Sequence, residues 1–374
     1  MGSQSLAANT KAERNYGIDL LRIVAMFMIC VLHILGHGGI LDSIKPGTVN
    51  YYVALFLETA MICAVNCYAM ISGFVGFGRR YKVSNVIYLW LQTAFYAVFI
   101  FAVFKIVYPD AVKLKWIAKA AFPVLHNDYW YFSAYFGLFF FMPLLNFILN
   151  NLSEKKLRVS LFCIIVVFTG ASFFNKGNVF SLNRGYSTIW LVILYLVGGY
   201  FAKYQPLKKI KSGALALIIF SLVVATYILQ FAVKAVAARF SGETAWWSNM
   251  IINYSSPFVF LTAAFMLEIF SRLKFKGKPR LIAFFAPLTF GVYLIHDHEY
   301  FSSNVICGRF ADFVSYNPIV MTLAIVGTAI CIYVGCSLID YLRLLLFKIL
   351  KVKPTLEKLE NKVKNKIFEG KSDA

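Results

Sequence analysis

Runs of apolar residues long enough to cross a lipid bilayer dominate this sequence and restrict the folds open to it. A membrane-spanning helix needs about 20 predominantly apolar residues, and several runs in the chain exceed that length. The 374 residues are 60% hydrophobic and only 14% charged, whereas charged residues make up about 25% of a soluble protein. The sequence predicts an all-α polytopic integral membrane protein with about ten transmembrane helices.

The apolar runs form one large membrane domain between polar ends. Residues 1–16 form a polar segment, residues 17–347 the predicted transmembrane domain, and residues 348–374 a basic tail whose apolar residues recur at helical spacing. Such a tail is typical of a helix lying on a membrane surface. The basic amphipathic segment 113–125 either lies flat on the outer headgroups or marks a miscounted helix. The predicted helices are 17–37, 51–74, 84–108, 129–149, 159–174, 188–202, 213–235, 250–271, 282–301 and 318–347.

The positive charges indicate the orientation of these helices. The net charge is +20, but most Lys and Arg residues lie in short segments between apolar runs. With the N-terminus inside, 26 of them are cytoplasmic and 10 lie outside or at outer helix ends. Cytoplasmic loops are enriched in Lys and Arg, so we expect both termini in the cytoplasm. We expect these Lys and Arg residues to contact lipid headgroups of the cell membrane, and we expect no nucleic-acid partner.

The seven cysteines give no sign of a metal site. They form neither CxxC pairs nor clusters with histidine at metal-ligand spacing, and we expect no metal.

Arg22 and His33 lie within the first apolar run, 17–37. A guanidinium in an apolar segment is costly, because hydrocarbon cannot solvate it. Eleven positions make almost three helical turns, so both side chains point the same way, roughly 16 Å apart along the axis. A cation near one membrane face and an imidazole above it indicate a site for a long anionic ligand. The alternatives are an arginine that reaches the headgroups and a buried structural histidine.

The R-x10-H spacing in GIDLLRIVAMFMICVLHI resembles helix one of the acyltransferase-3 family of integral membrane acyltransferases. Further stretches are similar to the same family. They are SGF at 72–74, WYFSAYFGLFFFMPLLN at 130–146 and GVYLIH at 291–296. These stretches follow one another in the family's order and spacing, and the ten-helix layout agrees with it. Together they cover most of the chain.

This resemblance implies a reaction. Family members move an acyl group, often acetyl, from cytoplasmic acyl-coenzyme A to a hydroxyl of a glycan or glycolipid. Acetyl-CoA is then the donor substrate, and the partner is a glycan or lipid-linked saccharide. His33 matches the essential family histidine and would act as general base, since an unperturbed imidazole has a pKa of about 6.5. Arg22 matches the helix-one arginine.

Basic residues at the predicted cytoplasmic rim are candidates for binding the donor. Guanidinium groups suit phosphates because they donate paired hydrogen bonds. Many family members carry an RxxR pattern near the start of helix three, and GRRYKVSNVIYLW departs from it. Ordinary positive-inside charge explains the basic residues at 79–82 equally well. Ser72 and Gly73 suit either a close approach of the backbone to a ligand or close helix packing. The candidate donor-binding residues are Arg22, Ser72, Gly73, Arg79, Arg80 and Lys82.

Two carboxylates complete the candidate catalytic set with His33. Asp19 lies in the first turn of helix one, where the helix dipole alone favours a carboxylate. Glu58 lies in helix two toward the outer face. An intramembrane carboxylate is a functional candidate by default, with a structural partnership as the alternative.

The acceptor should approach from the outer side. Aromatic faces combined with carboxylates and imidazoles suit a carbohydrate, although an aromatic belt or a solvated helix end explains the same residues. The cluster that begins with His296 and Asp297 could instead orient His33. The candidate acceptor-binding residues are Asp128, Trp130, Tyr131, His296 and Asp297.

Two other classes of function fit a polytopic chain with intramembrane charges. One is a secondary transporter or exporter of a small solute or glycolipid, although the internal repeats common in transporters are not evident. The other is a non-catalytic glycolipid-binding membrane component. Binding of coenzyme A by the purified protein separates the acyltransferase from both.

Overall fold

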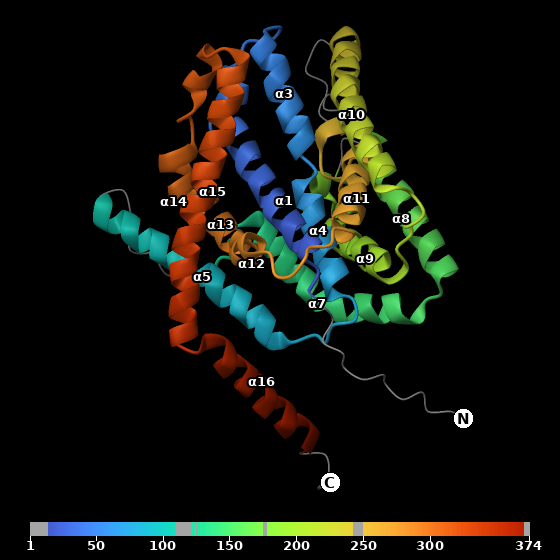
Figure 1. Cartoon of the computed structure of the whole chain (residues 1–374), viewed down its shortest axis with the longest axis vertical. Helices are drawn as coiled ribbons and strands as arrows, with labels where there is room; N and C mark the ends of the chain where they lie inside the picture. The colour runs from blue at the N-terminus through green and yellow to red at the C-terminus, as the bar shows by residue number, and fades with distance from the viewer. Residues whose placement is uncertain are drawn as a thin grey trace.

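The computed structural model describes residues 14–109, 122–124, 126, 128–174, 178–241 and 250–369, and every regular element in these ranges is helical (Figure 1). Seven helical segments of the described chain are long and apolar enough to cross a membrane, or up to nine if each of two bent helix pairs is one span. The predicted all-α membrane class is confirmed. The count of ten and the cytoplasmic termini stay predictions, and most of the predicted surface segment 113–125 lies outside the described residues.

Most predicted helices appear with boundaries shifted by a few residues. Short helical segments lie between the longer ones: α2 (Ile40–Ser43), α12 (Arg280–Phe285) and α14 (Glu299–Phe301). The longer helices are α1 (Tyr16–Leu35), α3 (Val49–Met61), α4 (Ala64–Gly76), α5 (Val83–Val107), α7 (Trp130–Asn151), α8 (Glu154–Phe174), α9 (Thr188–Tyr204), α10 (Ser212–Ser241), α11 (Pro257–Ser271), α13 (Thr289–His296), α15 (Pro318–Ile349) and α16 (Val352–Glu369).

Helix α1 runs through the middle of the bundle and contacts α3, α4, α11, α13 and α15 (Figure 1). The Asn15 side chain caps its start by accepting a hydrogen bond from the Ile18 N–H at 3.1 Å, which satisfies one of the unpaired N–H groups of a helix terminus. Helix α1 is apolar on most of its surface, which is typical of a helix that neighbours surround. Polar side chains on this helix therefore face the protein interior.

Helices α4 and α9 pack with their backbones in close contact. A Cβ atom on Gly73 would lie 1.9 Å from the Tyr195 carbonyl oxygen, and one on Gly198 would lie 2.0 Å from the Met70 carbonyl oxygen. Small residues permit such close helix contacts in membrane proteins. Gly73 therefore serves helix packing, which is one of the two roles considered for it from the sequence.

Three segments predicted as continuous helices are interrupted. The predicted helix 51–74 is divided between α3 and α4 at Ile62 and Cys63. Within the predicted helix 250–271, which is one candidate membrane span, the regular helix α11 begins only at Pro257, where a proline fits the first helical turn. The predicted helix 282–301 is wrong, because α13 ends at His296 and the chain bends by 66° into the following segment.

His298 explains the bend after α13. Its backbone is extended (φ −62°, ψ 133°), and its ring nitrogen Nδ1 accepts a hydrogen bond from the Tyr300 N–H at 3.2 Å to cap α14. A side-chain cap of this kind favours a new helix start over continuation of the old one. The interruption leaves Asp297 at the end of α13.

A buried ion pair positions α13 against α15. Arg343 donates to both carboxylate oxygens of Asp340 at 2.7 and 2.8 Å, and both side chains are buried. The Tyr96 hydroxyl donates to the same carboxylate at 2.7 Å. A Cβ atom on Gly291 would meet the Asp340 side chain at 2.0 Å, so α13 lies directly on this pair. Loss of one partner of a buried pair typically costs about 3–5 kcal/mol.

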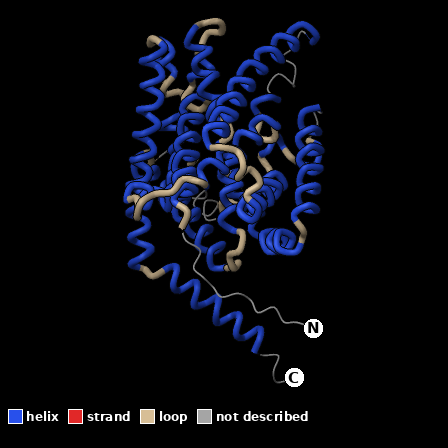
Figure 2. The backbone as a smooth tube through the Cα atoms, turned by 45° about the vertical axis from the view of Figure 1, so that its right-hand side comes forward, coloured by secondary structure: helices blue, strands red, loops and turns tan. Residues whose placement is uncertain are grey.

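The tail helix α16 lies at the same end of the molecule as the start of α1 (Figures 1 and 2). Glu360 accepts hydrogen bonds from the N–H groups of Val83 and Ser84 at 3.1 Å each, which caps the start of α5. Glu357 pairs with Lys82 at 3.0 Å. The predicted tail helix is confirmed. That it lies on the membrane surface stays a prediction, which agrees with its exposed apolar residues Leu359, Val363 and Ile367.

Candidate active site

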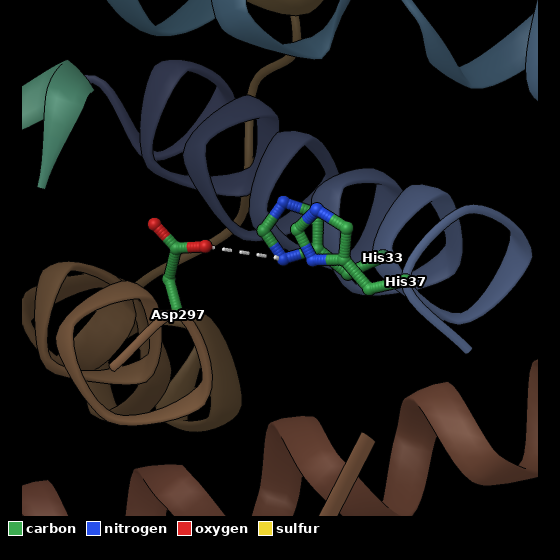
Figure 3. A group of neighbouring side chains, drawn as sticks. All are labelled: His33, His37 and Asp297. Atoms are coloured by element: carbon green, nitrogen blue, oxygen red, sulfur yellow. Dashed lines mark ion pairs between the residues drawn. The ribbon is translucent and has the colours of Figure 1, made fainter. Parts of the chain in front are cut away.

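His33 lies in a cluster of titratable side chains at the junction of α1 and α13. His37 lies in the turn that follows α1, four residues after His33, and the two imidazole centroids are 4.6 Å apart. The break after α13 turns Asp297 toward them, with its Oδ1 atom 3.7 Å from Nδ1 of His33 (Figure 3). Thus two residues predicted for different roles, the general base and an acceptor contact, meet in one site.

A second imidazole from α13 faces the same point. The ring centroid of His296 lies 4.9 Å from that of His33, and its Nδ1 atom is 2.6 Å from the Val292 carbonyl oxygen. Only a protonated Nδ1 can donate to a carbonyl, so neutral His296 carries its lone pair on Nε2. That atom and Nδ1 of His33 are buried, and neither has a hydrogen-bond partner among the described residues. Buried polar atoms are nearly always hydrogen-bonded, so these two are available to a bound molecule.

The same cluster has the composition of a cation site. One donor atom each from His33, His37 and Asp297 lies within 4.8 Å of the others, and imidazole and carboxylate are common zinc ligands. These three residues are therefore those that could hold a metal ion. The expectation of a metal-free site stays a prediction.

A small aromatic cavity of about 60 Å³ adjoins His33. Trp130 and Tyr131, both predicted to contact the acceptor, line it from the start of α7. The Tyr131 hydroxyl is buried and has no hydrogen-bond partner among the described residues. The other ring-bearing residues of this lining are Tyr68, Tyr254, Phe290 and Tyr293.

A second pocket, of about 210 Å³, collects the predicted donor-binding cations, and we call it the basic pocket. Asp19 lies beside it and accepts a hydrogen bond from Nη1 of Arg22 at 3.0 Å, so this carboxylate orients the arginine. Lys82 already pairs with Glu357 of α16. Five of the six predicted donor-binding residues line the basic pocket, with Gly73 as the exception: Arg22, Ser72, Arg79, Arg80 and Lys82.

Tyrosines stand between the basic pocket and the His33 cavity. Tyr135 lines the basic pocket, Tyr131 lines the His33 cavity, and their rings are stacked 5.9 Å apart. The Tyr68 hydroxyl donates to the backbone carbonyl of Arg22 at 3.0 Å. Arg22 and His33 therefore face adjacent cavities that aromatic side chains divide.

A third pocket, of about 410 Å³, contains Glu58, and we call it the mixed-charge pocket. It also receives Arg184 and Lys234, from the turn before α9 and from α10. No hydrogen bond or ion pair of the described chain joins Glu58 to His33. Asp128 lines none of these three pockets, and its backbone N–H donates to the Pro123 carbonyl at 3.1 Å.

The candidate sites from the sequence omit several of these side chains. His37 is four residues after His33, a spacing that predicts one stripe of helix one for both; the helix itself ends at Leu35, and His37 lies in the following turn. The remaining residues come from distant segments, and only the folded chain brings them to the site: Tyr68, Tyr135, Arg184, Lys234 and Tyr254.

A family model described as an acyltransferase domain matches residues 15–339, which span α1 to most of α15. The chain belongs to the acyltransferase-3 family. No curated protein and no solved structure matches the chain significantly. As a member of that family, the protein is a membrane acyltransferase, and the matched region of this acyltransferase contains His33, the basic pocket and the mixed-charge pocket.

Proposed function

We propose that this acyltransferase is a membrane O-acetyltransferase that moves an acetyl group from cytoplasmic acetyl-CoA to a hydroxyl of a cell-envelope glycan or its lipid-linked precursor. The observation that carries the proposal is the position of His33. Nδ1 of this imidazole is buried and has no hydrogen-bond partner among the described residues, and the ring lies on a small cavity next to a pocket of cations. A donor with anionic phosphates and a distant reactive thioester fits that arrangement.

The basic pocket would bind the nucleotide end of the donor. Arg22, Arg79 and Arg80 offer guanidinium groups, which form paired hydrogen bonds with phosphate oxygens. The roughly 16 Å of helix rise between Arg22 and His33 is comparable to the reach of an extended pantetheine arm. The arm must pass the stacked rings of Tyr131 and Tyr135, so donor binding requires these side chains to rotate.

The size of the His33 cavity favours a short acyl group. Pockets that hold an entire drug-sized ligand measure about 300–1,000 Å³, whereas the His33 cavity has a volume of about 60 Å³. An acetyl group fits a space of this size, and a fatty acyl chain does not. This supports acetyl-CoA as the donor.

His33 would act as the general base. Its imidazole takes the proton of the acceptor hydroxyl while the hydroxyl oxygen attacks the thioester carbonyl carbon. The tetrahedral intermediate collapses, the carbon–sulfur bond breaks, and the coenzyme A thiolate leaves and takes the proton back from the imidazolium. Asp297, 3.7 Å from His33, stabilises the imidazolium that forms during attack. The products are an O-acetyl ester and coenzyme A.

The test uses wild-type and His33→Gln proteins in membranes supplied with labelled acetyl-CoA. We expect the variant to lose transfer to the membrane glycan while its affinity for coenzyme A stays within about twofold of wild type. His126→Gln is the matched control, because His126 is exposed and does not line the three pockets. Undiminished transfer by His33→Gln would overturn the assignment of the base, and failure of the wild type to bind coenzyme A would overturn the proposed donor.

A further inference from the structure

The mixed-charge pocket is large enough for a whole ligand. Its volume of about 410 Å³ falls in the range of about 300–1,000 Å³ that is typical of ligand pockets. Helices α3 and α10 form two of its walls and are held together by polar contacts. The Gln230 amide donates to the Thr59 hydroxyl at 2.8 Å, and the Tyr227 hydroxyl donates to the Tyr52 carbonyl at 3.0 Å.

Three charged side chains line this pocket. Glu58 is half-buried on α3, Lys234 is half-buried on α10, and Arg184 is exposed in the turn before α9. Within the described residues, no hydrogen bond or ion pair within 4.0 Å uses the side chain of Glu58, Arg184 or Lys234. Unpaired charges on a membrane helix mark a functional site by default.

The turn that carries Arg184 has a constrained backbone. Arg184 itself adopts a left-handed conformation (φ 54°), which is unfavourable for a residue with a side chain. The next residue, Gly185, has φ 96°, and a Cβ atom there would lie 2.5 Å from Cβ of Tyr254. The turn is thereby packed against Tyr254, and strained conformations of this kind cluster at ligand-binding and active sites.

Aromatic rings connect the mixed-charge pocket with His33. Tyr254 lines both the mixed-charge pocket and the His33 cavity. Its ring is 4.7 Å from that of Tyr186 in the mixed-charge pocket and 5.9 Å from that of Trp130 in the His33 cavity. Tyr254 therefore forms part of the boundary that the two cavities share.

We propose that the mixed-charge pocket binds the acceptor and selects a saccharide that carries an acidic group beside its free hydroxyls. This inference rests on the proposed function. The guanidinium of Arg184 and the ammonium of Lys234 bind the acid, since charge-assisted hydrogen bonds to carboxylate or phosphate are stronger than neutral ones. The carboxylate of Glu58 accepts hydrogen bonds from sugar hydroxyls. A neutral saccharide leaves both cations without a partner.

The test compares three soluble probes: methyl glucuronide, glucose 6-phosphate and methyl glucoside. Binding to the purified full-length protein is measured by saturation-transfer NMR, which detects weak sugar complexes and needs no turnover. We expect at least one acidic probe to bind tenfold or more tightly than methyl glucoside. Which of the two binds identifies carboxylate or phosphate as the recognised acid.

Variants link that preference to the pocket. Arg184→Gln and Lys234→Gln should each reduce the acidic-over-neutral preference by at least fivefold, whereas Lys234→Arg should keep it. Arg239→Gln, which changes an exposed arginine further along α10, is the matched control. Equal binding of all three probes by wild type, or an unchanged preference in both glutamine variants, would overturn the proposal.

The same assay separates this proposal from the proposed function. His33→Gln should lose acetyl transfer and retain the binding preference for the acidic probe. If coenzyme A does not bind and the preference is present, the acyl donor is wrong and the saccharide pocket stands. If labelled acetyl reaches a membrane glycan and the preference is absent, the reaction stands and the pocket assignment fails.

Discussion

His33 obtains its surroundings from two parts of the chain that are more than 250 residues apart. The turn after its own helix supplies His37, while the end of α13 supplies His296 and Asp297. The R-x10-H spacing predicts His33 because that signal is local to one helix. No local pattern shows that Asp297 would face it, since the contact depends on the helix break at His298.

Replacing Asp297 by Asn should slow transfer without weakening donor binding. Asparagine keeps the size of the side chain but removes the charge that stabilises the imidazolium of His33. We expect kcat for acetyl transfer to fall by roughly 10²-fold, at the lower end of general acid–base contributions, with the KM for acetyl-CoA little changed. Steady-state kinetics check this, with the exposed Asp312→Asn as control. An unaltered kcat would contradict the role given to Asp297.

Helix breaks and close helix crossings position these side chains. The apolar runs predict where most helices lie, because transfer of a run from water to lipid depends on local composition. They do not predict the interruption of 282–301, which a single side-chain cap at His298 produces. Nor do they show that Gly73 meets the Tyr195 carbonyl rather than a ligand, because that contact joins helices more than 100 residues apart.

Gly73→Ala should destabilise the protein, although alanine normally stabilises a helix relative to glycine. The new Cβ atom would lie 1.9 Å from a backbone oxygen of α9, so the two helices must separate. Overpacking of this kind typically costs about 1–3 kcal/mol, and thermal unfolding of the purified protein should show a lower Tm. Gly170→Ala on α8, where nothing lies within 4 Å, should leave the Tm equal or higher. A Tm of Gly73→Ala no lower than that of Gly170→Ala would refute this account of the crossing.

The complete bundle places two pockets along α1 and a third beside them. The basic pocket lies near the start of α1, the His33 cavity follows, and the mixed-charge pocket adjoins that cavity through Tyr254. The sequence predicted the two ends of the proposed donor path, Arg22 and His33, and the cations beside Arg22. It could not identify the tyrosines between them, because aromatic residues occur throughout the chain and only tertiary packing distinguishes these few.

The charge bias of the loops predicts which end faces the cytoplasm, and chemical labelling of cysteine can test it. Cys307 is exposed near the predicted outer end. A membrane-impermeant maleimide should label it in intact cells, and Cys307→Ser should remove that label. A cysteine placed at exposed Lys358 on α16 should react only after the membrane is permeabilised. The reverse pattern would invert the topology and place the basic pocket outside.

Lys82 has two possible anionic partners, and it can neutralise only one of them at a time. It lines the basic pocket, yet its ammonium is held by Glu357 of α16. A phosphate entering beside Arg79 would compete with that glutamate for the same cation. If coenzyme A binds in the basic pocket as proposed, its phosphate would displace Glu357 from Lys82, and the contact of α16 with the start of α5 would then weaken until coenzyme A leaves.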